Sequence, residues 1–179
     1  MALNATIYKF ALSISDLNRD FYDSMQLTVA QHPSENAERM MVRVLAYCLE
    51  ACEGLAFTKG LSTPETPDLW AKSLDDQINL WVEVGEPAAD KIKKATRLAK
   101  KVKVYTFNSK SDVWWSQEQK KLEALDVSVV QFPWDQIQSV TKLLARTMTM
   151  SVTITDDSIF VNADNGDAEV HWQRLQTKE

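Results

Sequence analysis

Two acidic residues and the lysines that follow them have the types and order needed for metal-dependent chemistry. Asp68 comes just before an apolar segment, Glu83 lies near the end of the next one, and Lys91 and Lys94 follow. Carboxylates are the protein ligands that Mg²⁺ prefers, with waters and substrate phosphates completing its shell. A cation held in this way activates a bound water and stabilises charge at phosphorus. The pattern therefore predicts a two-carboxylate site for phosphodiester chemistry.

Glu83 lies near the carboxyl end of a predicted strand. Ligands of α/β sheets collect at this end of the strands. Gly85 is expected on the same face as Glu83 but has no side chain, so it leaves space beside the carboxylate. The Val84 carbonyl would be a third oxygen ligand. The strand is predicted from alternation, with one face formed by Ile78, Leu80, Val82 and Val84 and the other by Asn79, Trp81 and Glu83.

A lysine close to the second carboxylate would complete such a site, but the strand does not provide one. The chain has Glu83-Val84-Gly85 where a Glu-x-Lys triplet would be expected. Residues 88 to about 101 are predicted to form the next helix, whose side chains lean toward its N-terminus. Lys91 and Lys94 are three residues apart and share a helix face. Either could therefore place an ammonium beside Glu83.

A third carboxylate, Glu38, lies on the apolar stripe of a helix predicted to begin near Pro33. A carboxylate on a core-facing stripe needs a partner, a cation or a cleft. Cys48 and Cys52 lie on the same stripe and are predicted to be buried core thiols, reduced as in a cytoplasm.

The same residues also have a purely structural interpretation. An Asp after a Pro is often a turn residue or a helix cap. A Glu on the polar face of a strand is often solvated, and the lysines would form the solvated face of a helix whose apolar stripe packs on the sheet. Residues alone leave both interpretations open.

The elements around these residues predict the α/β class, in the form of a mixed α+β sheet. Strand, helix and strand between residues 78 and 107 form a βαβ crossover with parallel strands. Alternation predicts β-hairpins near both termini. The hairpins near the C-terminus are predicted to turn at Asp156-Asp157 and Asn165-Gly166. The remaining predicted elements are helices at about 112–125 and 135–146 and a strand at 127–132, in one domain spanning 1–179.

Composition limits the partners. The formal net charge is -5, so any contact with nucleic acid must use a local basic patch, and the candidate is a basic helix from Lys91 to Lys103. No apolar run is long enough for a bilayer and the start does not read as a signal peptide, which predicts a cytoplasmic protein without membrane contact. The two histidines argue against a multi-histidine metal site.

Taken together, several short motifs resemble the YaeQ family of bacterial proteins. The resemblance covers nearly the whole chain. The family is placed as a variant of the PD-(D/E)XK, or restriction-endonuclease-like, fold. The motifs are His32-Pro33-Ser34-Glu35, Glu38-Arg39-Met40-Met41, Trp81-Val82-Glu83-Val84-Gly85, Lys93-Lys94-Ala95, Val113-Trp114-Trp115 and Arg146-Thr147-Met148-Thr149.

The resemblance implies roles for the candidate residues. Asp68 stands at the first acidic position, Glu83 at the second, and Glu38 at the extra acidic position on the first helix. Gly85 departs from the lysine of the motif, which some relatives of the fold carry on the next helix; Lys94 is the first choice for that role and Lys91 the second. The implied nuclease-like core is about 34–132, with the hairpin 6–29 before it and the β segment 147–172 after it.

Two functions are therefore expected. The first is a Mg²⁺- or Mn²⁺-dependent nuclease-like protein, with Asp68, Glu83, the Val84 carbonyl and Glu38 around the metal and a lysine supplying positive charge. The second is a catalytically inactive protein of the same fold that binds protein or nucleic acid in a regulatory role. Net acidity and the absent strand lysine favour the second.

Overall fold

The chain divides into two compact units, each made from separate stretches of sequence. The computed structural model describes residues 4–59 and 65–178. The first unit combines residues 1–49 with 133–172, and the second combines 50–132 with 173–179. Gly60 and Pro64, residue types that predict turns, lie outside the described residues. That the chain forms a single domain stays a prediction.

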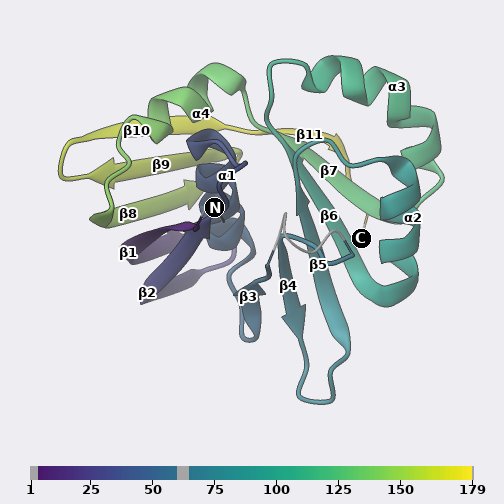
Figure 1. Cartoon of the computed structure of the whole chain (residues 1–179), viewed down its shortest axis with the longest axis horizontal. Helices are drawn as coiled ribbons and strands as arrows, with labels where there is room; N and C mark the ends of the chain where they lie inside the picture. Colours follow the sequence, from purple (N-terminus) through teal and green to yellow (C-terminus); the bar gives the residue numbers. More distant parts are fainter. Residues whose placement is uncertain (1–3, 60–64, 179) are drawn as a thin grey trace. The chain divides into compact units, whose positions relative to one another are not determined.

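The first unit contains a five-stranded sheet in the order β10-β9-β8-β1-β2 (Figure 1). Neighbouring strands are antiparallel, except that β1 and β8 are parallel. The hairpins predicted near both termini are confirmed, and the parallel pair joins them into one sheet. The strands are β1 (Thr6–Asp16), β2 (Phe21–Gln31), β8 (Thr147–Thr155), β9 (Ser158–Ala163) and β10 (Gly166–His171).

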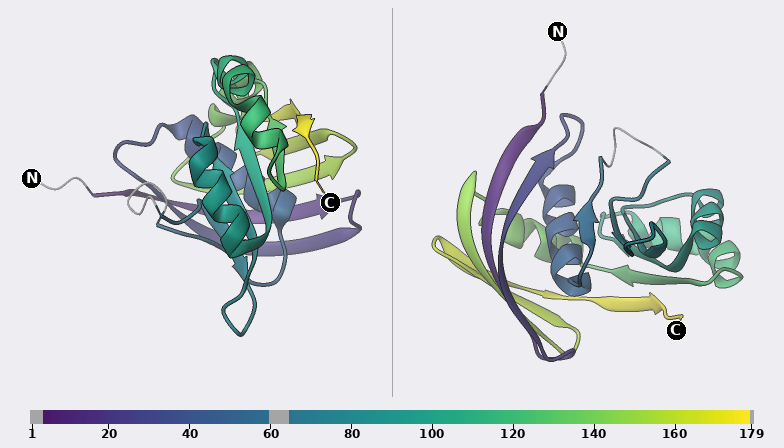
Figure 2. Two further views of the ribbon diagram at one scale, coloured as in Figure 1. Left: turned by 90° about the vertical axis from the view of Figure 1, so that its right-hand side faces the viewer. Right: turned by 90° about the horizontal axis from the view of Figure 1, so that it is seen from below.

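Alternating apolar side chains form the core of the first unit. Phe10, Leu12 and Ile14 of β1 are buried. In β8, four alternating apolar residues are buried in the same way: Met148, Met150, Val152 and Ile154. The helices α1 (Ala37–Glu50) and α4 (Trp134–Thr141) lie on the inner side of this curved sheet (Figure 2). Helix α4 ends five residues before its predicted end at Arg146.

Helix α1 begins later than predicted. The chain turns at residues 33–34, and Asn36 is the capping residue, because its Oδ1 accepts a hydrogen bond of 2.8 Å from the Arg39 amide. Cys48 is buried, as predicted. Cys52 lies beyond the end of the helix at Glu50 and is exposed, so its predicted burial is wrong: the apolar stripe stops with the helix.

The second unit contains a six-stranded mixed sheet in the order β11-β7-β6-β5-β4-β3. Strands β5, β6 and β7 are parallel, and the other pairs are antiparallel. The predicted strand–helix–strand unit with parallel strands is thus confirmed. The strands are β3 (Leu55–Phe57), β4 (Leu69–Lys72), β5 (Ile78–Val84), β6 (Ala99–Thr106), β7 (Val127–Gln131) and β11 (Gln173–Gln176).

Two crossover helices, α2 (Ala89–Leu98) and α3 (Ser111–Glu123), pack on one face of this sheet (Figure 2). Ile92 and Ala95 of α2 lie in one apolar cluster with Val102 and Val104 of β6. Because side chains alternate along a strand, the neighbours of these valines point to the opposite face.

The prediction of a basic helix from Lys91 to Lys103 is wrong for the second half of this segment. Helix α2 ends at Leu98, and Ala99 already pairs with Ile78 in the sheet. Lys101 and Lys103 are therefore strand residues, and the basic residues fall into two groups on different elements. The overall class is nevertheless the mixed α+β class that the sequence indicates, with four helices and two mixed sheets among residues 4–59 and 65–178.

Candidate functional site

Asp68 and Glu83 lie side by side in the second unit. Strands β4 and β5 are antiparallel with Leu69 opposite Val82, so Asp68 comes next to Glu83 at the end of this pair. The Asp68 amide donates to the Val82 carbonyl at 2.9 Å. Both acids are nearly inaccessible, at 3% and 4% exposure. The fold thus brings together two carboxylates that are separated in the sequence.

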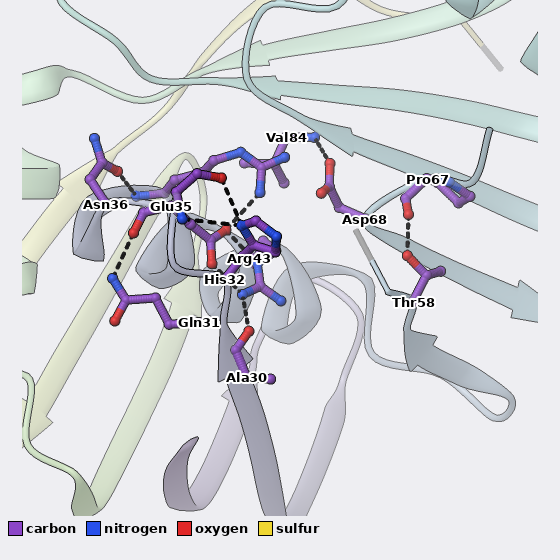
Figure 3. Close-up of polar contacts among 12 residues, drawn as sticks. Ala30, Gln31, His32, Glu35, Asn36, Arg43, Thr58, Pro67, Asp68 and Val84 are labelled. Atoms are coloured by element: carbon purple, nitrogen blue, oxygen red, sulfur yellow. Dashed lines mark hydrogen bonds and ion pairs between the residues drawn. The ribbon is translucent and has the colours of Figure 1, made fainter. Parts of the chain in front are cut away.

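The Asp68 carboxylate is fixed by the backbone of the neighbouring strand. Its Oδ2 accepts a hydrogen bond of 2.7 Å from the Val84 amide (Figure 3). This bond holds Asp68 at the carboxyl end of β5, where a ligand of a parallel sheet is expected. The Val84 carbonyl belongs to the same short segment.

The Glu83 carboxylate has one partner from its own strand and one from the following helix. The Trp81 indole N–H donates to Oε1 at 2.9 Å, and Lys91 Nζ lies 3.2 Å from Oε2. Burial, and secondly the charge of Asp68, raise the pKa of Glu83 above its ordinary value. Lys91 and the Trp81 hydrogen bond lower the pKa, but by less.

Lys91, the second choice from the sequence, is the lysine that reaches Glu83. Lys94 is exposed and lies one helical turn further from the start of α2. Both lysines line one cavity of about 390 Å³, together with Glu65, Trp81, Ala95 and Leu98. The site therefore has a contact lysine, Lys91, and a more remote one, Lys94, beside the same space.

The backbone at Gly85 explains why the strand carries no lysine. Gly85 has φ of 120°, in the region that only glycine adopts readily, and its amide donates to the Tyr105 carbonyl at 2.8 Å. A Cβ placed there would meet no atom within 4 Å, so the space next to Gly85 is open. A lysine at this position would be strained, although it would not collide with a neighbour.

Glu38 belongs to the first unit, on α1, where it is half-buried. Its assisting role at the metal stays a prediction. The buried acid of this region is Glu35, which sequence reasoning missed.

The Glu35 carboxylate is held by two arginines of α1. Oε1 accepts from Arg43 Nη2 at 2.6 Å, and Oε2 accepts from Arg43 Nε at 2.9 Å (Figure 3). Oε2 also accepts from Arg39 Nη1 at 2.6 Å. Arg43 also donates to the Ala30 carbonyl at the end of β2. Glu35 thus joins the turn before α1 to the helix, which is a structural role. The spacing of four and eight residues to two arginines was the signal for it.

The donor chemistry of the site fits a hard divalent cation. Asp68 and Glu83 supply two buried carboxylates, and the charge of Asp68 disfavours ionisation of Glu83, an effect that a cation bound by both would relieve. The Val84 carbonyl would be a third oxygen, leaving other positions to water and substrate. Within residues 4–59 and 65–178, no three side chains of His, Cys, Asp or Glu converge on one point. The ligands would thus be two carboxylates and backbone.

The fold and the site together define a mixed α+β protein with paired carboxylates and a lysine at the end of a parallel strand. No helix within the described parts of the chain is both long and apolar enough to cross a membrane.

Comparisons with known proteins show the family. The family model for YaeQ protein matches residues 1–172. Uncharacterized protein YaeQ of Escherichia coli (strain K12) is 40% identical over 97% of this chain and 99% of that protein, and its counterpart from Salmonella typhi is 38% identical over the same shares. The chain belongs to the YaeQ family.

Two solved structures agree with this assignment. The crystal structure of YaeQ protein from Pseudomonas syringae superposes with a TM-score of 0.92 at 38% identity, covering 97% of both chains. That of YaeQ protein from Xanthomonas axonopodis pv. citri has a TM-score of 0.93 at 31% identity, covering 97% of this chain and 99% of the other.

Proposed function

We propose that this chain is a divalent-metal-dependent hydrolase of phosphodiester bonds in nucleic acid, built on a variant of the PD-(D/E)XK nuclease-like fold. One observation carries the proposal: Asp68 and Glu83 are adjacent and buried at the end of β4 and β5, with Lys91 3.2 Å from Glu83. Two carboxylates and a lysine are the chemical groups that the motif requires. Here the lysine comes from α2.

Each residue has a separate task in this proposal. Asp68, anchored by the Val84 amide, and Glu83, oriented by Trp81, would hold Mg²⁺ or Mn²⁺ with the Val84 carbonyl. The ion, when bound, supplies an activated water and stabilises charge on the phosphate. Lys91 places its ammonium beside the same carboxylate, where it neutralises charge that develops on the phosphate oxygens.

The cavity beside Lys91 supports a position for the substrate. It is lined by one acid, two lysines and three residues with apolar surface: Glu65, Lys91, Lys94, Trp81, Ala95 and Leu98. Lysines would contact phosphate oxygens, and apolar surface would accept a sugar or base. Trp81 links this cavity to the carboxylates, since its indole nitrogen is bonded to Glu83.

Cleavage assays test the proposal directly. Single- and double-stranded DNA and RNA are incubated with the purified chain in Mg²⁺, Mn²⁺ or EDTA. We expect cleavage that requires the ion and is lost in Glu83→Gln and Asp68→Asn, which keep size and remove charge. The exposed pair Lys120 and Lys121 of α3, changed together to alanine, is the matched control and should retain activity. Equal inactivity of all variants and the unmodified chain across both ions would contradict the hydrolase.

One observation favours the alternative, a nuclease-fold protein without activity that binds protein or nucleic acid. Both oxygens of Glu83 already have partners, Trp81 and Lys91, so the charge of this one carboxylate is already offset by a lysine of the chain. In that case Mn²⁺ would bind weakly in calorimetry, and Glu83→Gln would leave Mn²⁺ binding unchanged. A stoichiometric partner that co-purifies without any need for a divalent ion would then support the binding role.

A further inference from the structure

The second unit has a basic groove on the sheet face opposite its two helices. The groove, a cavity of about 320 Å³, crosses β6, β7 and β11. Lys101 and Lys103 alternate with Val102 and Val104, which face α2, so the two lysines point to the other face. This groove is therefore separate from the site around Glu83, which is on the helix-covered face.

The register of the strands explains why cations gather there. Lys103 is paired with Ser128 of β7, and Arg174 of β11 is paired with Val130, two residues further along β7. Ser128 and Val130 alternate with Val127 and Val129, which are in the core, so they share the groove face. Three strands thus contribute to one surface.

The charge of the groove is strongly unbalanced for a chain with a formal net charge of -5. Asp126 is the single acid among the residues that line it, against five cations. Among these cations, Lys103 is paired with Glu50 at 2.7 Å and Lys178 Nζ donates to the Glu123 carbonyl at 3.4 Å, and the lining as a whole keeps a clear excess of positive charge. The five are Lys100, Lys101, Lys103, Arg174 and Lys178.

The walls of the groove are held in place. The Lys178 amide donates to the Ser128 hydroxyl at 3.0 Å, which fixes the C-terminal segment against β7. On the other side, Glu50 accepts from Lys103 at 2.7 Å and from the Tyr105 hydroxyl at 2.5 Å. A preordered cationic surface binds anions at lower entropic cost than flexible side chains do.

We propose that this groove binds an anion with several linked phosphate groups, recognised through the phosphates. Lysine and arginine together on one surface favour phosphate oxygens. The lining residues include no aromatic side chain on which a base could stack, so recognition is independent of base identity. The volume lies in the range of small-ligand sites and accommodates a short run of phosphates. This binding site does not depend on the proposed hydrolase.

Calorimetric titration of the full chain at low salt in EDTA tests the groove without contribution from a divalent ion. The probes are inorganic tripolyphosphate and a single-stranded oligothymidine. Lys101→Ala combined with Lys178→Ala removes two groove lysines, and Lys120→Ala combined with Lys121→Ala removes two exposed lysines of α3. Circular dichroism verifies that each variant is folded. The single Lys101→Gln variant, a milder change, is titrated in the same way in case the double groove variant does not fold.

We expect at least one probe to bind, with about tenfold weaker binding in the groove variant and unchanged binding in the α3 variant. For the oligonucleotide, the slope of log affinity against log salt should fall by about 1.4, since each lost contact on a single strand accounts for about 0.7. Binding of tripolyphosphate alone identifies a small polyphosphate, and binding of the oligonucleotide alone identifies a polynucleotide. The proposal is overturned if neither probe binds the unmodified chain, or if both double variants weaken binding equally.

Discussion

Lys91 Nζ lies 3.2 Å from Glu83 Oε2, and it approaches the carboxylate from the first turns of the helix that follows the strand. The Lys91 side chain is 36% exposed, whereas that of Glu83 is 5% exposed. A partly solvated lysine therefore neutralises a buried acid. Gly85 has φ of 120°, a backbone conformation in which a lysine would be strained. Lys91 of α2 therefore supplies the positive charge that a lysine at position 85 would have placed beside Glu83.

Lys91 and Lys94 should differ in their effect on cleavage. Lys91→Ala removes the ammonium beside Glu83, and we expect kcat to fall by about 10²-fold or more, as for loss of one electrostatic donor. Lys94→Ala removes a charge from the rim of the cavity and should change mainly KM. Steady-state kinetics on a fluorescent oligonucleotide in Mg²⁺ measures both. A larger loss of kcat in Lys94→Ala than in Lys91→Ala would show that Lys94, the first choice from the sequence, is the lysine that stabilises charge on the phosphate.

The raised pKa of Glu83 predicts a pH dependence of stability. A group whose pKa is raised by folding stabilises the folded state below its unfolded pKa of 4.5, and this contribution is lost as pH rises through the folded value. Glu83→Gln, which cannot ionise, should therefore become more stable relative to the unmodified chain as pH rises from about 4 to 7. The direction includes the opposing effect of Lys91. Urea unfolding in EDTA measures the free energy of unfolding of both proteins at each pH. A difference between them that stays constant with pH would contradict the prediction.

Local patterns predict the elements and two of the three site residues that meet. Alternation in residues 78–84 places Glu83 at a strand end, and Asp68 follows from its position before the preceding strand. The choice between Lys91 and Lys94 depends on distance along the helix axis. Three residues displace a side chain by about 4.5 Å, enough to separate contact from rim, and sequence periodicity does not resolve this.

Other features depend on pairing between distant residues. Lys100 and Lys101 are equally compatible with the exposed face of a helix and with the exposed face of a strand. They belong to a strand because Ala99, just before them, pairs with Ile78 in the sheet. The parallel contact of β1 with β8 joins segments about 140 residues apart, which no local pattern encodes. Glu35 was missed because it lies outside α1, in the turn, and meets Arg43 only after that turn forms.

Asp68 should contribute to stability as well as to metal binding. Asp68→Ala removes the acceptor of the Val84 amide, and an unsatisfied buried amide costs about 1–3 kcal/mol. Asp68→Asn keeps a side-chain oxygen that can accept this bond, so it should lose less stability while losing affinity for Mn²⁺. Urea unfolding and calorimetry separate the two effects. Equal stability of Asp68→Ala and the unmodified chain would show that the amide finds another partner.

Glu35 should matter more for stability than Glu38. The Glu35 side chain is 1% exposed and Arg43 is 7% exposed, so Glu35→Ala leaves a buried guanidinium without its carboxylate, at a cost of about 3–5 kcal/mol. Glu38 is half-buried in the first turn of α1, where its loss removes at most about 1 kcal/mol of helix-dipole stabilisation. Denaturant titration of the two alanine variants gives the comparison. A similar loss in both would contradict the structural role of the Glu35 cluster.

The two cysteines should react at very different rates. Cys48 is fully buried on α1, and burial raises the pKa of its thiol to about 12, so almost no thiolate forms at neutral pH. Cys52 is exposed just beyond the helix. A thiol reagent such as DTNB should therefore label one thiol within minutes under native conditions and the second only in denaturant. Cys52→Ser should abolish the fast phase and Cys48→Ser should preserve it. Rapid labelling of both thiols in the folded chain would show that α1 opens at its C-terminal end.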